Sequence, residues 1–587
     1  MHSIHSRGQR WFFFKLRISF IRRMALILAM LGTAAGAQAD ALACSAAAAP
    51  EFGTPPLTVH FTASASGGAA PYTFAWDFGD AAFGSGAALS HIYTAIGTYT
   101  WTLTVTDQVA AVCTNIGVIS VSSVVTHSVF LASAARASGA AGTNWKTDVM
   151  MLNTGTAAIQ YVIYYTPAGM DGTSTPYVYE GTIPPAGAPL LTNIVETLFG
   201  LAESAGSVRI VSNGPLKVSS RTYNDTGSGT YGQWVPGQTL SDAIAPPARA
   251  YLSAELIGVV ENADFRSNIG FSEIGGQAAL VLVNVFDGQN NPLESNFEVT
   301  LPPYGWVQLP LSAFGVSSGD NLRVQLVNQG PGTVLGYASV VDNATGDAVF
   351  IPARRDDDVA GDTHQLVAIT ARIAGDFGTD WSADLYLYNP LSTDQYVTLQ
   401  FIAPQGVFNA SLTLAANEVR AVHDAVSSLF PEAGTHTAGS LQILSDQGLI
   451  LVSRIYNQTS AGTYGQFVPA FDPDEPVSVG VPADLLMVIQ NGDYRTNIGF
   501  SEFFGIATTV SAILYDSEGN TIAITSSPMQ VPAGGNIQIG LSALFNLASP
   551  LDSGRVRIQV TGGGAVYPYV SVVDDRTGDA VFVPGIP

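Results

Sequence analysis

A long internal duplication constrains the fold of this chain more than any other feature. The stretch SVVDNATGDAVFIP begins at Ser339 and returns as SVVDDRTGDAVFVP at Ser571. Three more segments return at a similar spacing: TYGQWVP at Thr230 returns as TYGQFVP at Thr463, FRSNIGFSE at Phe265 as YRTNIGFSE at Tyr494, and TNWKTDVMMLN at Thr143 as TDWSADLYLYN at Thr379. One large unit has therefore been duplicated, and both copies are expected to fold alike.

Each large unit is itself double. Every half opens with an aromatic residue that is followed three positions later by Asp or Asn, and every half ends on an apolar run that closes on proline. The opening pairs are Trp145 with Asp148, Phe265 with Asn268, Trp381 with Asp384, and Tyr494 with Asn497. We therefore predict four related repeats of about 110 residues, an ordinary size for a β-sandwich: A1 (127–240), B1 (248–354), A2 (364–471) and B2 (480–587).

The composition favours strands and turns over helices. Charged residues make up only 12% of the chain, which contains 60 Gly and 32 Pro. Short runs rich in Thr, Val and aromatic residues alternate with turn residues. The expected fold class is all-β, a string of immunoglobulin-like β-sandwich domains.

Residues 1–39 predict an export signal. Six basic residues precede an apolar run that starts at Met24, and Ala37-Gln38-Ala39 supplies the small residues of a cleavage site. The apolar run is too short to span a bilayer. A lipid anchor on Cys44 is the alternative, although the preceding residues do not match the usual signal for it. We expect a secreted or cell-surface protein with no integral membrane segment in the mature chain.

The net charge excludes one class of partner. The chain carries a formal charge of −23, and the leader removes basic but no acidic residues, so the mature chain is more acidic still. Such a surface repels nucleic acid and anionic lipid. It is compatible with bound cations, although solubility outside the cell is the simpler explanation.

Residues 43–123 carry a recognisable series of strands. The segments PPLTVHFTASASGG, YTFAWDFGD and SHIYTAIGTYTWTLTVTD follow one another in this stretch. In order and spacing they resemble the PKD (polycystic kidney disease) domain, an immunoglobulin-like β-sandwich found in secreted bacterial proteins. The resemblance implies a spacer or interaction module. The family usually has glycine where this chain has Ala81.

The resemblance assigns structural roles to one motif and to the two cysteines. Trp76 is expected to fill the space between the two sheets. Asp77, Phe78, Gly79 and Asp80 complete the motif, and its aspartates and glycine are expected to form a turn. Cys44 precedes the first strand and Cys113 the last, so in an exported sandwich we expect them to form a disulfide.

No catalytic constellation stands out in the sequence. Histidines 127, 364, 423 and 436 are scattered, and none of them has metal-ligand spacing. The stretch GVSSG (315–319) matches a nucleophile-elbow pattern in letters only, because no strand leads into it and its duplicate lacks it. Residues that occur in two or four copies are more simply structural than catalytic. We therefore expect no enzymatic activity.

Two sets of residues are candidate binding sites. The acidic turns of the B repeats suit calcium, although a structural turn explains them better, because calcium takes six to eight oxygens. Their candidate ligands are Asp342, Asn343, Asp347, Asp574, Asp575 and Asp579. Trp145 and Trp381 are either core anchors or stacking platforms for sugar rings. No other cofactor is expected.

The sequence thus predicts a class of function. We expect a non-enzymatic protein that acts in adhesion, extracellular scaffolding or interaction with an extracellular protein or polysaccharide. The alternative is a polysaccharide-binding accessory protein of a secreted degradative system.

Overall fold

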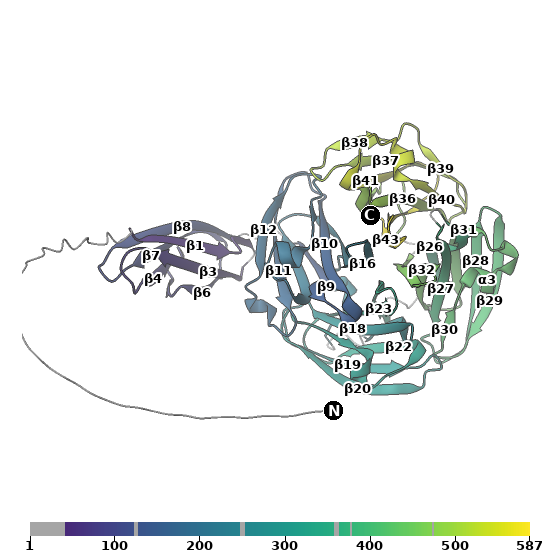
Figure 1. Ribbon diagram of the computed structural model, residues 1–587, viewed down its shortest axis with the longest axis horizontal. Helices are drawn as coiled ribbons and strands as arrows, with labels where there is room; N and C mark the ends of the chain where they lie inside the picture. Colours follow the sequence, from purple (N-terminus) through teal and green to yellow (C-terminus); the bar gives the residue numbers. More distant parts are fainter. Residues whose placement is uncertain are drawn as a thin grey trace, which may run out of the picture.

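The chain forms an N-terminal β-sandwich followed by a closed ring of four further sandwiches (Figure 1). The computed structural model describes residues 41–53, 55–121, 127–246, 253–356, 363–375, 378–471 and 475–587. The expected export signal lies outside these ranges. The all-β class is confirmed. Within the described ranges, no helix has the length and apolar character that a membrane crossing needs.

The N-terminal sandwich consists of two sheets with strand orders β1-β3-β6 and β2-β8-β7-β4-β5. Its strands are β1 (Ala43–Ala49), β2 (Phe52–Gly53), β3 (Leu57–Ser66), β4 (Thr73–Asp77), β5 (Phe83–Ser85), β6 (Ala88–Tyr93), β7 (Gly97–Thr106) and β8 (Val112–Val121). Trp76, Trp101 and Phe61 meet edge to face between the sheets and form the centre of the core.

The four ring repeats share one topology of eight strands, four in an outer layer and four in an inner layer. In A1 the outer order is β12-β11-β14-β9, and the inner sheet holds β10, β13, β15 and β16. The A1 strands are β9 (His127–Ser138), β10 (Asn144–Asn153), β11 (Ile159–Pro167), β12 (Val178–Ile183), β13 (Leu190–Leu191), β14 (Ser204–Ser212), β15 (Leu216–Asp225) and β16 (Thr230–Pro236).

B1 repeats this order as two separate sheets, β20-β19-β22-β17-β25 and β21-β18-β23-β24. Its strands are β17 (Ser253–Glu261), β18 (Phe265–Glu273), β19 (Ala279–Phe286), β20 (Pro292–Leu301), β21 (Trp306–Pro310), β22 (Gly319–Asn328), β23 (Val334–Asp342), β24 (Ala348–Pro352) and β25 (Arg354–Arg355).

The second pair of repeats has the same design. A2 contains β26 (His364–Ala374), β27 (Asp380–Tyr388), β28 (Gln395–Ala403), β29 (Gly406–Leu414), β30 (Val419–Val422), β31 (Thr437–Ser445), β32 (Ile450–Thr459), β33 (Gly462–Val468) and β34 (Ala470–Phe471). B2 contains β35 (Ala483–Gln490), β36 (Tyr494–Ser501), β37 (Thr508–Tyr515), β38 (Thr521–Ile524), β39 (Met529–Val531), β40 (Asn536–Gly540), β41 (Leu551–Gly562), β42 (Tyr567–Asp574) and β43 (Ala580–Pro584).

A single helical turn precedes the long strand β14, β22, β31 or β41 of each repeat. These turns are α1 (Ile194–Thr197), η4 (Leu311–Phe314), α3 (Ala425–Leu429) and α4 (Leu541–Phe545). Other short helical turns lie in connecting loops: η1 (Ala140–Gly142), η2 (Gly172–Ser174), η3 (Leu240–Asp242) and η6 (Pro431–Ala433). Each of the four turns buries its apolar side against the repeat's own core, so it closes one end of the sandwich.

The last hairpin of each repeat points into the centre of the ring. Strands β16, β24, β33 and β43 contact one another in a circle, so the fourth repeat closes onto the first (Figure 1). Tyr231 of A1 and Tyr464 of A2 stack across this centre, with ring centroids 5.1 Å apart. The ring is therefore one connected body, held together by apolar and hydrogen-bonded junctions between neighbouring repeats.

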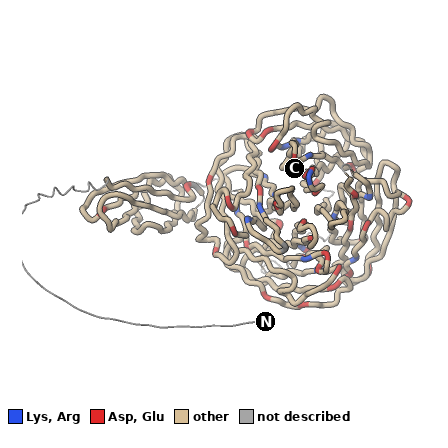
Figure 2. The backbone as a smooth tube through the Cα atoms, in the orientation of Figure 1, with Lys and Arg blue, Asp and Glu red and all other residues tan. Residues whose placement is uncertain are grey.

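The hydrophobic cores run across the junctions. The core of B1 includes Tyr386 and Val452 of A2, and the core of B2 includes Met150 and Leu152 of A1. Lys and Arg lie mostly toward the inside of the ring, whereas Asp and Glu also occupy its outer rim (Figure 2). The junctions are consequently the places where apolar surface, cations and carboxylates meet.

Candidate ligand-binding pocket at the B1–A2 junction

The acidic turn of B1 docks onto the neighbouring A2 repeat. The Asp342 carboxylate accepts hydrogen bonds from the backbone N–H groups of Ala344 and Thr345 on Oδ1, at 2.9 and 3.0 Å. Its Oδ2 accepts from the N–H and the hydroxyl of Thr463 in A2, both at 2.8 Å. A carboxylate has about four acceptor positions, so these donors occupy all of them.

The acidic turn of B2 docks onto A1 in the same way. Asp574 Oδ2 accepts from the N–H and the hydroxyl of Thr230, each at 2.9 Å. Its Oδ1 accepts from the backbone N–H of Arg576 at 2.9 Å. These bonds, together with the Arg576 guanidinium, lower the pKa of Asp574 in spite of its burial. The two turns thus act as matching locks between repeats.

The second aspartate of each turn completes the lock. Asp347 Oδ2 accepts from the N–H of Gly465 at 2.6 Å, and Asp579 Oδ2 accepts from the N–H of Gly232 at 2.8 Å. Both side chains are buried, and their Oδ1 atoms have no hydrogen-bond partner in the described structure. Burial raises the pKa of Asp347 to about 7 and raises that of Asp579 as well.

The remaining calcium candidates pair with arginines. Asn343 Oδ1 accepts from Arg266 at 2.8 Å, and Asp575 forms an ion pair with Arg495. Over the ranges that the structure describes, no three His, Cys, Asp or Glu side chains form a group that could hold a metal ion. The geometry of these turns therefore matches repeat-to-repeat docking.

Trp145 and Trp381 lie at the other two junctions, half-buried. Each lines a cavity of about 360 Å³, Trp145 between A1 and B1 and Trp381 between A2 and B2. The indole of Trp381 donates to the hydroxyl of Thr379 at 3.0 Å. The two tryptophans thus lie in separate cavities and do not form one exposed row.

The N-terminal motif has the expected geometry. Trp76 is buried, and its indole donates to the carbonyl of Gly86 at 2.9 Å. Asp77 accepts from the N–H of Gly79, and Asp80 accepts from the N–H of Ala82 and contacts His91. Phe78 packs flat against the His91 ring. These contacts fix the turn between β4 and β5.

The disulfide between Cys44 and Cys113 is confirmed. It joins β1 in one sheet to β8 in the other, with the two Cα atoms 6.0 Å apart. Ala81 occupies the usual glycine position of the motif and adopts a left-handed φ of 72°. Alanine at this position therefore adopts the left-handed backbone conformation that suits glycine, and this places some strain on the backbone.

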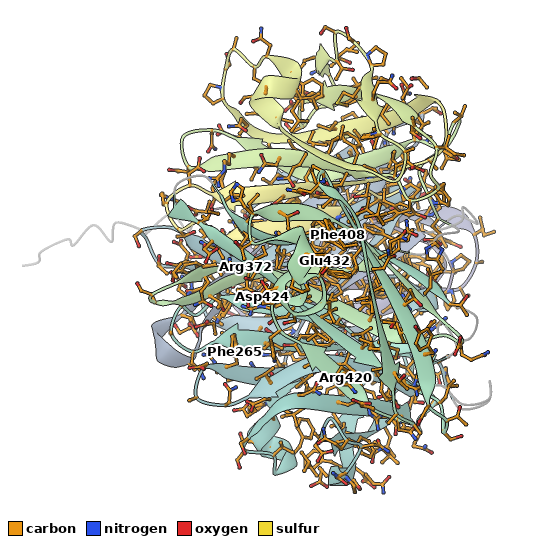
Figure 3. The ribbon with its side chains drawn as sticks, turned by 90° about the vertical axis from the view of Figure 1, so that its right-hand side faces the viewer. Phe265, Arg372, Phe408, Arg420, Asp424 and Glu432 are labelled. Atoms are coloured by element: carbon orange, nitrogen blue, oxygen red, sulfur yellow. A yellow bond between two sulfur atoms is a disulfide. The ribbon has the colours of Figure 1, made fainter. Side chains whose placement is uncertain are left out.

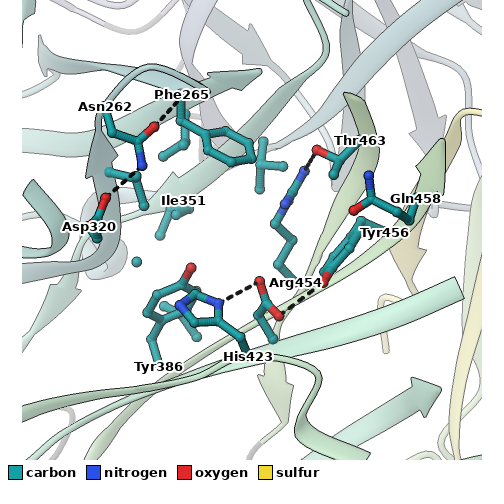
Figure 4. A pocket seen from close by; sticks show the side chains of 16 residues that line it. Asn262, Phe265, Asp320, Ile351, Tyr386, His423, Arg454, Tyr456, Gln458 and Thr463 are labelled. Carbon is teal, nitrogen blue, oxygen red and sulfur yellow. Dashed lines mark hydrogen bonds and ion pairs between the residues drawn. The ribbon is translucent and has the colours of Figure 1, made fainter. Parts of the chain in front are cut away.

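The pocket with the most varied chemistry lies between B1 and A2. Its volume is about 430 Å³, within the range of small-molecule sites. B1 contributes Asn262, Phe265, Asp320 and Ile351, and A2 contributes the remaining labelled side chains, from Tyr386 to Thr463 (Figure 4). In the side view, Phe265 lies below the outer helical turn that carries Asp424 (Figure 3). Aromatic faces and polar groups thus surround one space.

A polar cluster forms one wall of this pocket. Nδ1 of His423 lies 3.2 Å from Oδ2 of Asp384, and the hydroxyl of Tyr456 donates to Oδ1 of Asp384 at 3.4 Å. The hydrogen bond that His423 donates to the Asp384 carboxylate raises the pKa of His423. The imidazole is largely exposed, whereas Asp384 is buried, so His423 is the group that a ligand would meet first.

Arginine and amide groups face the same space. The guanidinium of Arg454 donates to the hydroxyl of Thr463 at 2.6 Å and stacks over the rings of Phe265 and Tyr456. On the B1 side, Asn262 donates to Asp320 at 2.7 Å. The pocket therefore offers hydrogen-bond donors and acceptors beside aromatic faces.

The matching B2–A1 junction has the same carboxylates but a different filling. Asp148 stands where A2 has Asp384, and Asp552 stands where B1 has Asp320. When the two copies are aligned by their strand pairing, Met150 stands at the position of Tyr386 and Thr192 at the position of His423. Tyr494 replaces Phe265, and its hydroxyl bonds the hydroxyl of Thr230 at 2.9 Å.

One bulge residue decides whether the space is open. Gly258 occupies an irregularity in β17 with φ of 75°, and a Cβ there would lie 3.2 Å from Tyr386. Met487 occupies the equivalent bulge in β35 with φ of 60°, and its buried N–H contacts the sulfur of Met150 at 3.2 Å. At the B2–A1 junction, Met150 and Met487 fill the space that Gly258 leaves open at the B1–A2 junction.

The sequence identified only part of this pocket. Phe265, Asp384 and Thr463 stand in repeated segments, and His423 was noted as one of several scattered histidines. Gly258 and the importance of His423 were missed. The available signal was the difference between the copies at these positions, glycine against Met487 and histidine against Thr192.

Comparison with known proteins characterises the N-terminal part. Residues 44–121 match the family model of the PKD domain. The N-terminal sandwich is a PKD domain. Among solved structures, it is similar to the PKD1 domain of Vibrio anguillarum Epp, with 29% identity, 14% of this chain and 96% of that chain covered, and a TM-score of 0.13. It is also similar to the PKD1 domain of the Vibrio cholerae metalloprotease PrtV, at 27% identity, covering 14% and 99%, with a TM-score of 0.13.

The match to the PKD domain ends before the ring begins. A larger part of the chain, 53%, aligns at 10% identity and a TM-score of 0.14 with 98% of a solved structure described as carbohydrate-binding modules from the β-sandwich superfamily. No curated protein matches the chain. The function of the ring therefore has to be argued from its own residues.

Proposed function

We propose that the chain is an exported, non-enzymatic binding protein whose ring holds a saccharide in the B1–A2 pocket. The observation that carries the proposal is the contrast between the two copies of this junction. Gly258 leaves the space open in one copy, and Met487 and Met150 fill it in the other. The filled copy shows that side chains can close this junction, so the open copy is the one with room for a ligand.

The lining of the pocket favours a polyhydroxylated ligand. Phe265, Tyr386 and Tyr456 offer ring faces to the apolar face of a sugar. Asn262 and Gln458 offer amide groups for its hydroxyls. The volume of about 430 Å³ accommodates one or two sugar rings.

Binding without catalysis is the simpler role for the acidic groups. Asp384 and Asp320 both have counterparts in the filled junction, where no substrate would fit, so their conserved positions suit structural bonds. The hydroxyl of Thr463 already donates to Asp342, which leaves it poorly placed as a nucleophile. We propose that the protein needs no cofactor and that calcium is not bound at its acidic turns.

The PKD domain and the expected export signal support an extracellular setting. In this proposal the PKD domain is a spacer that holds the ring away from its point of attachment. The ring would serve either an adhesin or an accessory protein of a degradative system, because both need a saccharide site without catalysis.

A glycan array followed by calorimetry on the mature protein tests the proposal. Gly258→Met introduces the residue of the filled junction and is expected to abolish saccharide binding without unfolding the ring. Met487→Gly is the matched control, because it changes the equivalent bulge and leaves the B1–A2 pocket intact. A neutral glycan that binds Gly258→Met as tightly as the parent would overturn the proposal, and so would an array on which nothing binds.

A further inference from the structure

A second cavity lies where the PKD domain meets the ring. Its volume is about 280 Å³, and its walls come from β3 of the PKD domain, from A1 and from Tyr304 of B1. Inside it, the guanidinium of Arg209 is sandwiched between two tyrosines. Its central carbon lies 4.1 Å from the ring centroid of Tyr164 and 4.2 Å from that of Tyr304.

Arg209 is held without a carboxylate. The structure gives its guanidinium no hydrogen bond or ion pair with any described residue, and its Nε atom is buried without a partner. Two arginines that are buried elsewhere pair directly, Arg323 with Glu255 at 2.9 Å and Arg555 with Asp484 at 2.8 Å. None of the described residues that line this cavity is acidic, although the chain has 46 Asp and Glu.

The duplicate of this site lacks every part of the sandwich. Gln400 and Gln442 form the cross-strand pair that corresponds to Tyr164 and Arg209. Gly534 occupies the position of Tyr304, in the same turn between a proline and a glycine. The arginine sandwich is thus found in the copy that carries the PKD domain.

Tyr304 adopts a strained backbone conformation in order to stand there. Its φ is 50°, in the left-handed region where Gly534 has a φ of 63°. A bulky residue in this region is strained, and such strain gathers at ligand sites. The matching turn of A1 has Ala186 at φ of 60° and that of B2 has Gly534, so the turn accepts small residues and does not itself require a tyrosine.

We propose that this cavity binds the carboxylate of an acidic sugar, a uronate, through Arg209. The planar guanidinium fork matches a carboxylate, and the two rings hold it in place at little entropic cost. Residues with hydroxyl groups line the same cavity, Thr58 of the PKD domain and Ser128 and Thr173 of A1, and the Thr173 hydroxyl also donates to Asp171 at 2.6 Å. A cavity of this size admits one sugar ring, and these hydroxyls suit the sugar's own hydroxyl groups.

Titration of the mature protein with galacturonate, galactose and acetate, followed by NMR or calorimetry, tests the proposal. Galacturonate is expected to bind, and galactose and acetate are each expected to bind at least tenfold more weakly than galacturonate. Arg209→Gln is expected to weaken galacturonate binding at least tenfold. Arg420→Gln is the control, since it removes a cation of A2 at a distance from the cavity, where Arg420 bonds the Glu418 carboxylate and the carbonyl of Thr413.

A second variant separates binding from folding. Tyr304→Gly installs the residue of the duplicate, so it is expected to keep or raise the melting temperature while weakening galacturonate binding. Equal galacturonate binding by Arg209→Gln would overturn the proposal, as would binding of an acidic peptide in place of the sugar acid. Gly258→Met is expected to leave galacturonate binding in this cavity unchanged. A result that contradicts this proposal can therefore be told apart from one that contradicts the proposal for the B1–A2 pocket.

Discussion

Thr230 and Asp574 are separated by 344 positions in the chain and joined by two hydrogen bonds. The backbone N–H and the hydroxyl of Thr230 both donate to Oδ2 of Asp574, each at 2.9 Å. Thr463 and Asp342 form the same pair at the B1–A2 junction. The repeated acidic turn is therefore a latch between B and A repeats, and its second copy closes the ring by joining the last repeat to the first.

Breaking this latch is expected to destabilise the ring. Asp574→Ala removes a buried acceptor that takes two hydrogen bonds from Thr230 and leaves the N–H of Thr230 without that partner, which costs about 3 kcal/mol. Urea unfolding followed by circular dichroism measures the change. Glu432→Ala, on the exposed outer turn labelled in Figure 3, is the control and should change stability by less than about 0.5 kcal/mol. Equal effects of the two changes would contradict the latch.

The stability of the ring is expected to fall as pH rises from 5 to 8. Burial raises the pKa of Asp347 from its ordinary value to about 7, so the folded state holds this proton more tightly than the unfolded state. The contribution is fully present below about pH 4, the ordinary aspartate pKa, and is lost as pH rises through about 7. Asp347→Asn should flatten the pH dependence of the urea midpoint. A midpoint whose pH dependence is the same in both proteins would be evidence against this.

Removal of the disulfide is expected to affect the PKD domain alone. The bond closes a loop with a sequence separation of 69 residues. Without it the unfolded chain gains conformational freedom, which lowers the stability of the domain by about 4 kcal/mol. Calorimetry of the Cys44→Ser, Cys113→Ser double variant should show a PKD transition at lower temperature and an unchanged ring transition. A shift of both transitions would mean that the two bodies unfold together.

Calcium removal is expected to leave the protein unchanged. The donors on Asp342 already occupy its acceptor positions, and Asp574 is similarly engaged by Thr230 and Arg576. The melting temperature should be the same in a chelator and in millimolar calcium. An increase with calcium that disappears in Asp342→Asn would reverse this expectation.

Part of the candidate site could be read from the sequence and part could not. Phe265 and Asp384 stood out because they recur at fixed places in the repeats. Their meeting in one pocket depends on the angle at which B1 packs on A2, and no local pattern encodes that angle. Gly258 reads as an ordinary strand glycine until the structure places it opposite Tyr386.

The sequence by itself determined the all-β class, the PKD domain and its disulfide, because strand periodicity, turn residues and spaced motifs are local properties of the chain. The duplication also implied that its segments serve a common structural need. Only the tertiary structure decided that the four sandwiches close into a ring, and that the acidic turns latch one repeat to the next. The physical reason is that a carboxylate in a turn is equally suited to its own backbone, to a cation and to a neighbour's N–H groups. In the folded chain Thr230 lies next to Asp574 and Thr463 next to Asp342, although each pair is more than a hundred residues apart in sequence. These contacts decide that the carboxylates bind the neighbouring repeat.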